Sequence, residues 1–296
     1  MLTEKEFNLL VLLSELDKRP TQRQLAQALD CSLGTANKLL RDAAEAGYYA
    51  GGHLTEKGQE ALEPYRVKRA IFLAAGFGAR MVPVTLNTPK PLVRVNGVRM
   101  IDTLLDAVTA AEIPEIVIVR GYLGEQFDQL LYQYPQIRFV ENPVFNECNN
   151  IASAMCVRYL FRNAYVLDAD LILKNPGVIR KYEYQTNLLG IPVKRTDDWC
   201  VTADKNGYAA SVAVGGVDGY RSVGIIYLNS EDGARLTEDI KEVYESPGGK
   251  ERFWEQTLLT YKKENYKVAI RTCSSGDVQE IDTFNELKQA DRTYSL

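Results

Sequence analysis

The spacing of hydrophobic positions along the chain changes near residue 66. Before that point, apolar residues recur at helical intervals, which predicts short amphipathic helices joined by turns. After it, continuous apolar runs of strand length alternate with segments of helical spacing. The change predicts two domains, a small one at residues 1–66 and a larger one at residues 67–296.

Residues 1–66 predict three helices, a hairpin and a last helix, in that order. Thr3 caps the first helix with Glu6 in the capping-box position, a second helix covers 21–29, and Ser32 caps the third. A short hairpin is expected at 48–55, with a helix after it. This order is that of a winged helix, and the run Q-L-A-Q-A-L-D-C-S-L-G-T-A-N-K-L-L-R resembles the helix-turn-helix core of bacterial regulators.

The charge of the small domain leaves its partner open. The third helix would expose side chains suited to base edges and phosphates, namely Ser32, Thr35, Asn37, Lys38 and Arg41. Residues 1–66 nevertheless hold eight Lys and Arg against ten Asp and Glu. Because contacts with phosphates supply most non-specific affinity for DNA, an acidic domain begins at a disadvantage. Both a DNA partner and a protein partner therefore stay open for this domain.

Residues 67–296 predict an α/β fold with a mostly parallel, Rossmann-like sheet. Strands are expected at 67–74, 115–120, 137–141 and 164–168, and the helices between them at 100–111, 125–134 and 150–161. Such alternation places helices on both faces of the sheet and ligands beyond the carboxyl ends of the strands. The pattern then becomes richer in strands, expected at 187–193, 199–203, 208–214 and 222–228, before helices at 231–245 and 252–263.

A loop with two glycines follows the first strand of the large domain. Gly76 and Gly78 let backbone N–H groups approach a polyphosphate, and Arg80 and Lys90 supply positive charge. The alternative is an ordinary turn after a buried strand, with surface cations beside it. The combination of L-A-A-G-F-G-A-R with T-P-K-P-L favours the nucleotide site, because it resembles the signature of the nucleotidyltransferase superfamily, whose members make nucleoside-diphosphate sugars and CDP-alcohols.

Two carboxylates are candidate ligands for Mg²⁺. Asp170 follows the strand at 164–168, at the edge of the sheet where a triphosphate would lie, and Asp282 follows a late strand. Each has an ordinary alternative, since Asp168 and Asp170 are common turn residues and Asp282 is a possible helix cap. The glycine loop favours metal binding, because nucleotide chemistry generally uses Mg²⁺ held by one or two carboxylates.

A narrower resemblance covers about residues 68–287. The blocks that carry it are K-R-A-I-F-L-A-A-G-F-G-A-R, N-T-P-K-P-L-V, V-R-G-Y-L-G-E-Q-F, E-C-N-N-I-A-S-A, V-L-D-A-D, D-D-W, R-F-W-E-Q and Q-E-I-D-T. Together they resemble the bacterial CTP:phosphocholine cytidylyltransferases. The winged helix is an addition to that family's minimal enzyme, and Glu255 stands where the family tends to carry Asp.

The resemblance implies a role for each matching residue. CTP would be held by Leu73, Ala75, Gly76, Gly78, Gly121, Tyr122, Gln126 and Asn150. Arg80 and Lys90 would be catalytic, with Mg²⁺ on Asp170 and Asp282. Phosphocholine would be bound by Trp199, Tyr227, Trp254 and Glu255. A trimethylammonium group cannot donate a hydrogen bond, so aromatic faces and a carboxylate suit it.

Composition agrees with an enzyme that works on small molecules. The net charge of −4 offers no polycationic surface to nucleic acid or anionic lipid. The sequence shows neither a signal peptide nor a membrane-spanning run, and its five cysteines form no C-x-x-C motif, so we expect a cytoplasmic protein. Two alternatives are a sugar-1-phosphate nucleotidyltransferase and a transcriptional regulator that only senses a nucleotide. The oligomeric state stays open.

Overall fold

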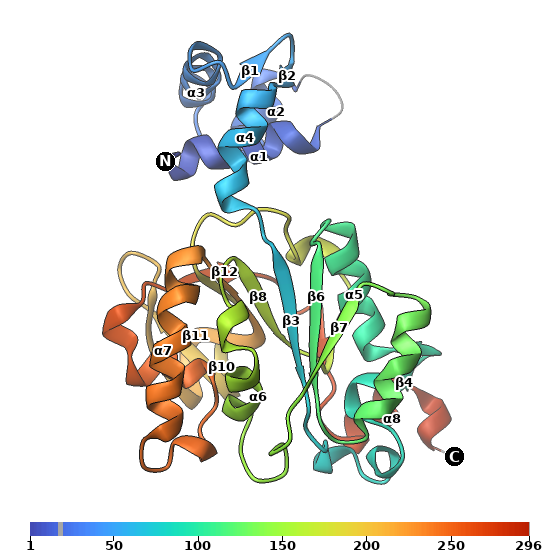
Figure 1. The fold of residues 1–296 in the computed structure, drawn as a ribbon. Coiled ribbons are helices and arrows are strands. Elements are labelled where there is room, and N and C mark those ends of the chain that lie inside the picture. Colours follow the sequence, from blue (N-terminus) through green and yellow to red (C-terminus); the bar gives the residue numbers. More distant parts are fainter. Residues whose placement is uncertain (17–19, 296) are drawn as a thin grey trace. The chain divides into compact units, whose positions relative to one another are not determined.

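The computed structural model describes residues 1–16 and 20–295, which divide into two compact units (Figure 1). The first unit comprises Met1–Arg66 together with Tyr182–Tyr184. The second comprises Val67–Lys181 and Gln185–Leu296. Across the described ranges, none of the helices combines the length and apolar character needed to cross a membrane.

The first unit contains the helices and the hairpin expected from its sequence. Its elements are α1 (Glu4–Glu15), α2 (Gln22–Ala28), α3 (Leu33–Glu45), β1 (Tyr49–Ala50), β2 (His53–Leu54) and α4 (Glu56–Leu62). The predicted caps are confirmed: Thr3 forms a capping box with Glu6, and the Ser32 side chain accepts from the backbone N–H of Thr35. Such caps satisfy N–H groups that have no partner inside the helix.

The core of the first unit includes side chains from the middle of the chain. Tyr182 is buried there, and the ring of Tyr184 stacks on that of Tyr65 at 5.6 Å between centroids. Phe7 lies 5.0 Å from Tyr65 and 5.4 Å from Tyr184, in tilted arrangements. The sequence pattern gave no sign of this participation, because residues 182–184 are far from the unit's other residues along the chain.

The second unit is built on a seven-stranded sheet with the order β12-β10-β11-β8-β3-β6-β7. Its strands are β3 (Arg69–Ala74), β6 (Glu115–Arg120), β7 (Ile137–Glu141), β8 (Ala164–Asp168), β10 (Asn187–Ala203), β11 (Ala209–Leu228) and β12 (Ala269–Thr272). Neighbours from β8 to β7 are parallel, as are β10 and β12, whereas β11 is antiparallel to both of its neighbours. The expected mostly parallel α/β sheet is confirmed.

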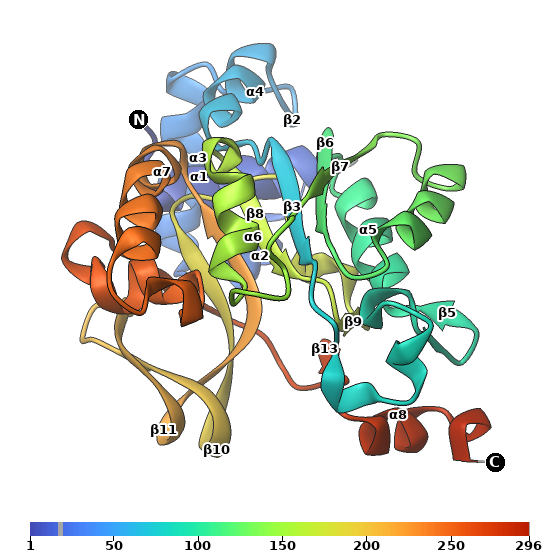
Figure 2. The same ribbon diagram turned by 60° about the horizontal axis from the view of Figure 1, so that its bottom comes forward.

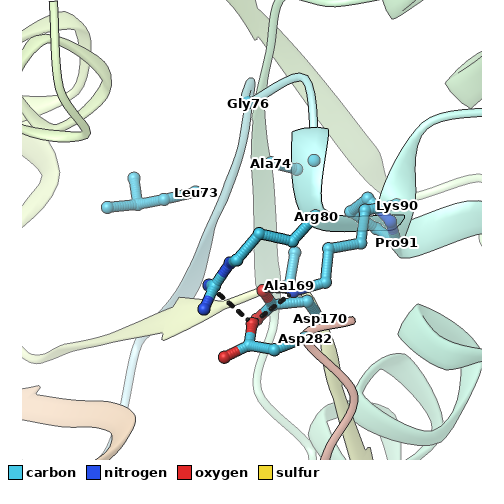
Figure 3. Close-up of a pocket in the computed structure, with 10 residues that line it drawn as sticks. Leu73, Ala74, Gly76, Arg80, Lys90, Pro91, Ala169, Asp170 and Asp282 are labelled. Carbon is cyan, nitrogen blue, oxygen red and sulfur yellow. Dashed lines mark hydrogen bonds and ion pairs between the residues drawn. The ribbon is translucent and has the colours of Figure 1, made fainter. Parts of the chain in front are cut away.

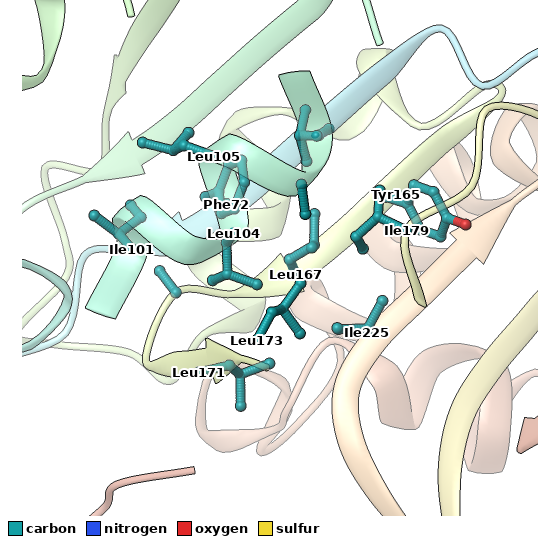
Figure 4. Packing of buried hydrophobic residues seen from close by; sticks show 14 of the residues in the cluster. Phe72, Ile101, Leu104, Leu105, Tyr165, Leu167, Leu171, Leu173, Ile179 and Ile225 are labelled. Carbon is teal, nitrogen blue, oxygen red and sulfur yellow. The ribbon is translucent and has the colours of Figure 1, made fainter. Parts of the chain in front are cut away.

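Successive side chains of β3 point to opposite faces of the sheet, where two separate hydrophobic clusters form the interior of this unit. Phe72 points into one cluster, where it meets Leu104 of α5 (Met100–Ala110) (Figure 4). Ile71 points into the other cluster, which α6 (Ile151–Cys156) and α7 (Ser230–Glu245) cover. Both faces of a parallel sheet must be covered, which explains why its strands read as continuous apolar runs.

Short elements complete the second unit beside the main sheet. They are β4 (Arg94–Val95), β5 (Val98–Arg99), β9 (Leu171–Leu173), β13 (Val278–Glu280) and α8 (Phe284–Ala290). The antiparallel pair β9 and β13 matters most for the site, because one strand follows Asp170 and the other precedes Asp282. Pairing of these strands brings two carboxylates that are distant in sequence to the same edge.

Several element predictions were wrong in detail. The four strands expected between residues 187 and 228 are two long ones, β10 and β11, which leave the sheet as a twisted ribbon (Figure 2). Irregular pairing around residues 196–202 bends the ribbon without ending either strand. The polar and glycine-rich sequence at such bends is typical of turns, which is why four short strands were predicted. The expected helices at 125–134 and 252–263 are instead mainly 3₁₀ and π turns, and the one at 150–161 ends as α6 at Cys156.

Candidate active site

The glycine loop begins where β3 ends and lies against Lys90. Gly78 adopts a φ of +70°, a conformation that disfavours other residues, and a Cβ there would meet the Cβ of Lys90 at 3.1 Å. A Cβ on Gly76 would meet nothing within 4 Å, so this position borders open space. The loop therefore packs tightly against the lysine on one side and leaves its backbone accessible on the other.

Lys90 joins the two carboxylates predicted to bind metal (Figure 3). Its Nζ donates to Oδ2 of Asp170 at 2.6 Å and to Oδ1 of Asp282 at 2.7 Å. Arg80 reaches the same Asp282 oxygen at 2.9 Å. Burial alone would lower the pKa of Lys90, but the two carboxylates outweigh it and the pKa is raised. Burial also opposes ionisation of Asp282, yet Lys90 and Arg80 hold its pKa below the ordinary value.

These groups line a small cavity of about 180 Å³ at the carboxyl ends of β3 and β8. The structure brings seven of the predicted site residues together around it: Leu73, Gly76, Gly78, Arg80, Lys90, Asp170 and Asp282. Ala75 is buried behind the loop, where its carbonyl accepts from the backbone N–H of Tyr122 at 3.1 Å. The helix-cap alternative for Asp282 is wrong, because Thr283 caps α8.

Three further predicted nucleotide residues lie beside the glycine loop. The hydroxyl of Tyr122 donates to the carbonyls of Thr85 and Leu86 at 2.9 and 3.0 Å, and its ring meets that of Phe77 edge-on at 4.7 Å. Gln126 donates to the carbonyl of Asn87 at 2.9 Å. Gly121 packs against Phe145, since a Cβ there would lie 2.6 Å from that ring. Tyr122 and Gln126 thus fix the segment that connects the glycine loop to Lys90.

A second cavity, of about 460 Å³, adjoins the first and is rich in carboxylates. Arg80, Asp170 and Asp282 line both cavities. The acidic side chains around the larger one are Asp168, Asp170, Asp198, Glu255, Glu280 and Asp282. Arg221 partly offsets this charge, because it pairs with Glu280 at 3.3 Å and with Asp198 at 3.7 Å. Such an accumulation of negative charge is suited to a cationic group.

Glu255 has an unusual environment on the wall of this larger cavity. Burial raises the pKa of its carboxyl to about 7, against a lowering effect of hydrogen bonds from its own backbone and from Asn150. Its Oε2 is buried and has no hydrogen-bond partner among the residues that the structure describes. Buried acceptors are normally satisfied, so this unpaired oxygen is unusual among the side chains that line the cavity.

Asn150 holds Glu255 in place. Its Oδ1 accepts from the backbone N–H of Trp254 at 2.9 Å, and its side chain hydrogen-bonds to Glu255. Asn149 fixes the same segment through bonds with the backbone of Lys250 and Glu251. Asn150, which the resemblance places among the residues that hold CTP, lies at the larger cavity, next to Glu255.

Two further acidic residues of this cavity have raised pKa values. Burial, followed by the nearby Glu255, raises the pKa of Asp168 well above its ordinary value. Burial and then Asp282 raise the pKa of Glu280 to about 8. No site role was predicted for Glu280, Asp198 or Phe253, which line the larger cavity and stand in blocks that carry the family resemblance.

The structure separates the predicted aromatic residues. Trp199 faces the larger cavity and meets Phe253 edge-on, with 5.3 Å between ring centroids. Trp254 is only 2% exposed and stacks on Phe161 at 6.1 Å, so it is a core residue. Tyr227 is also buried, and it pairs with Tyr165 near the start of β8, at the opposite end of that strand from Asp168. The predicted contacts of Trp254 and Tyr227 with the acceptor are therefore corrected.

Comparison with known proteins gives the class of this site. The family model for nucleotidyl transferases matches residues 69–188. A 2-aminoethylphosphonate cytidylyltransferase of Lancefieldella rimae is 33% identical over 228 residues, which are 76% of this chain and 92% of that protein. The choline-phosphate cytidylyltransferase of Streptococcus pneumoniae is 28% identical over 75% of this chain and 96% of its own length.

Solved structures agree. The crystal structure of the CTP:phosphocholine cytidylyltransferase from Streptococcus pneumoniae superposes with a TM-score of 0.70 at 26% identity, covering 77% of this chain and 99% of that one. The inositol-1-phosphate CTP transferase of T. maritima shares the fold, with a TM-score of 0.61 at 16% identity over 78% of this chain and 94% of that one. The chain belongs to the nucleotidyl transferase family and is a nucleotidyltransferase.

Proposed function

We propose that the protein transfers CMP from CTP to a small phosphoryl compound that carries a positively charged nitrogen. The observation that carries this proposal is a pair of adjoining cavities that share Arg80, Asp170 and Asp282. The smaller one adds the glycine loop and Lys90, which suit phosphates, and the larger one adds four further carboxylates and an aromatic pair. The names of the relatives, which describe cytidylyltransferases and in one case a CTP:phosphocholine cytidylyltransferase, support the choice of CTP as the nucleotide.

The reaction would be an in-line attack by a phosphoryl oxygen of the acceptor on the α-phosphorus of CTP. The new P–O bond forms as the bond to pyrophosphate breaks, and pyrophosphate leaves. A phosphomonoester is already mostly dianionic at neutral pH, because its second pKa is about 6, so the chain need not supply a base. The protein's part is to hold both reactants in line and to neutralise charge with Arg80 and Lys90.

Asp170 and Asp282 would hold Mg²⁺. Their oxygens fit the ion, because both converge on the single Nζ of Lys90 and so already surround one cation. In the described part of the chain, no group of three or more acidic, histidine or cysteine side chains is arranged to hold a metal. Two carboxylates plus substrate phosphates are nonetheless a common ligand set for Mg²⁺, which supplies charge neutralisation when bound.

Phosphocholine, the acceptor that the sequence resemblance implies, and 2-aminoethylphosphonate, in the name of one relative, both carry a cationic nitrogen. A sugar 1-phosphate fits less well, because its ring carries no positive charge to match the acidic side chains around the larger cavity. A purely sensory role is disfavoured because a sensor needs no cavity beyond the nucleotide.

The N-terminal unit would be a winged helix. Its three helices, two-stranded hairpin and fourth helix follow the order of that fold. A DNA or protein partner for it is a separate proposal that rests on this element order and on the exposed polar side chains of α3.

Direct turnover tests the proposed function. The purified protein would be incubated with Mg²⁺, each of the four NTPs and a panel of phosphorylated acceptors, and pyrophosphate release measured. We expect release with CTP and an amine-bearing acceptor. Turnover of a sugar 1-phosphate alone, or of another NTP alone, would contradict the proposal.

A further inference from the structure

We propose that the acceptor's nitrogen is a primary ammonium rather than a trimethylammonium, and that Oε2 of Glu255 accepts one of its N–H groups. This inference rests on the proposed function and narrows its substrate class. The ligand chemistry is a short chain with –NH₃⁺ at one end and a phosphate or a phosphonate at the other. Two observations support this inference: an unpaired carboxylate oxygen on Glu255 and the small number of aromatic faces around the cavity.

The unpaired oxygen is the first observation. Oε2 of Glu255 is buried in the wall of the larger cavity and has no partner among the described residues, whereas Asn150 bonds to the same carboxylate. A primary ammonium has three N–H donors and can satisfy this oxygen. A trimethylammonium presents only methyl groups, so its binding would leave a buried acceptor both dehydrated and unpaired, which is costly.

The fixed position of Glu255 strengthens this argument. The side chain of Asn150 accepts from the backbone N–H of Trp254, and that of Asn149 donates to the carbonyl of Glu251. These hydrogen bonds fix the segment that contains Glu255. The unpaired oxygen is thus a built feature of the wall. Asn150 serves as a positioning residue, because its side chain hydrogen-bonds to Glu255.

The aromatic lining is the second observation. Recognition of a quaternary ammonium typically uses several aromatic faces arranged as a cage. Among the described residues around this cavity, the aromatic rings are Trp199 and Phe253, and these meet each other edge-on at 72°. Trp254 and Tyr227, which would have completed a cage, are buried in the core. Carboxylates therefore outnumber aromatic rings around the cavity in which we place the acceptor's nitrogen.

The test compares acceptors that differ only in methylation. Steady-state kcat/KM would be measured with CTP and phosphoethanolamine, its mono- and dimethyl derivatives, and phosphocholine. 2-Aminoethylphosphonate forms a further arm that separates a phosphonate source from a phosphate source. We expect kcat/KM to fall as methyl groups are added, by roughly tenfold to a hundredfold over the series, as for the loss of a charge-assisted hydrogen bond. Equal or better use of phosphocholine would overturn the proposal.

Variants of Glu255 locate the effect. Glu255→Gln should remove most of the preference for the primary ammonium, whereas Glu255→Asp, which keeps a carboxylate, should retain it. Glu251→Gln is a matched control on an exposed side chain of the same segment and should leave the acceptor ratio unchanged. A Glu255→Gln enzyme that loses the same factor with every acceptor would also overturn the proposal, because Glu255 would then have only a structural role.

Calorimetric titration of the wild-type protein and the Glu255 variants gives a readout that does not need turnover. Phosphoethanolamine and phosphocholine would be titrated in the presence of CMP, and tighter binding of the primary amine is expected only with a carboxylate at residue 255. Failure of the proposed function has a different signature. In that case no amine-bearing acceptor is used with CTP, while another acceptor or another NTP supports pyrophosphate release.

Discussion

Replacement of Lys90 by methionine should separate the stabilising role of this lysine from its proposed catalytic role. Methionine keeps much of the apolar volume but removes the charge that Asp170 and Asp282 share. Lys90 is 7% exposed, and its Nζ lies 2.6 and 2.7 Å from the two carboxylates. Removal of one partner of a buried ion pair typically costs about 3–5 kcal/mol.

The low end of that range applies here, because the carboxylates keep part of their exposure to water. The side chains of Asp170 and Asp282 are 26% and 21% exposed, and Arg80 still pairs with Asp282. A loss of about 3 kcal/mol corresponds to a fall in Tm of roughly 6–12 °C in a domain of this size. Because Mg²⁺ would replace the missing cation, it should raise the Tm of the variant more than that of the wild type.

Thermal melting with and without Mg²⁺ is the assay, with turnover measured alongside. Lys267→Met, at an exposed lysine, is the matched control and should behave as wild type. The kcat of Lys90→Met should fall about a hundredfold or more, as expected when a transition-state charge contact is lost. An unchanged Tm in metal-free buffer would refute the ion-pair argument, and near-normal kcat would remove Lys90 from the catalytic machinery.

Four other predictions concern the tryptophans, Glu255 and Gly224. Trp199→Leu should raise the KM for the acceptor by roughly twofold to thirtyfold and leave the KM for CTP nearly unchanged, while Trp254→Leu should mainly lower the Tm; steady-state kinetics and melting curves distinguish the two tryptophans. Because the pKa of Glu255 is raised to about 7 and its carboxylate form binds a cation, kcat/KM for the acceptor should rise with pH between about 6 and 8, and Glu255→Gln should flatten that rise. The same raised pKa also affects stability. Between pH 4.5, the ordinary pKa of a glutamate, and about pH 7, the folded wild type holds a proton that the unfolded chain loses, so its free energy of unfolding falls as pH rises. The Tm of Glu255→Gln should therefore rise relative to that of the wild type over this interval. Gly224→Ala should destabilise the protein by a few kcal/mol and lower its activity, because Gly224 has a φ of +67° and a Cβ would lie 2.2 Å from Oδ2 of Asp168; denaturant unfolding measures the first effect, and full stability would show that Asp168 moves freely.

The lining of the smaller cavity was predictable because its signals are local. Continuous apolar runs predicted the parallel strands, and Gly76, Gly78, Arg80 and Lys90 lie within a short segment after β3. Asp170 was found in the same way, from its position after β8. Only a rule about sheet geometry was needed to bring these residues to one edge.

The lining of the larger cavity was harder to predict, because it depends on the path of the β10–β11 ribbon and of a segment with little regular helix. Trp199 and Trp254 both stand in blocks that carry the resemblance, and no local pattern separates the one at the cavity from the one in the core. That distinction requires the pairing of β10 with β11 and the position of the segment that Asn149 and Asn150 hold. The acidic residues converge for the same reason, from strands and loops that the sequence places far apart.

The inclusion of Tyr182 and Tyr184 in the core of the first unit has a practical consequence for anyone who divides this protein. Removal of residues 1–66 would leave the second unit with a loop whose Tyr182 and Tyr184 have lost Phe7, Tyr65 and the rest of their packing. An isolated fragment of residues 1–66 would in turn lack part of its interior. Gene fusions and domain exchanges should therefore keep Tyr182–Tyr184 together with residues 1–66, although the two segments are more than a hundred positions apart in the sequence.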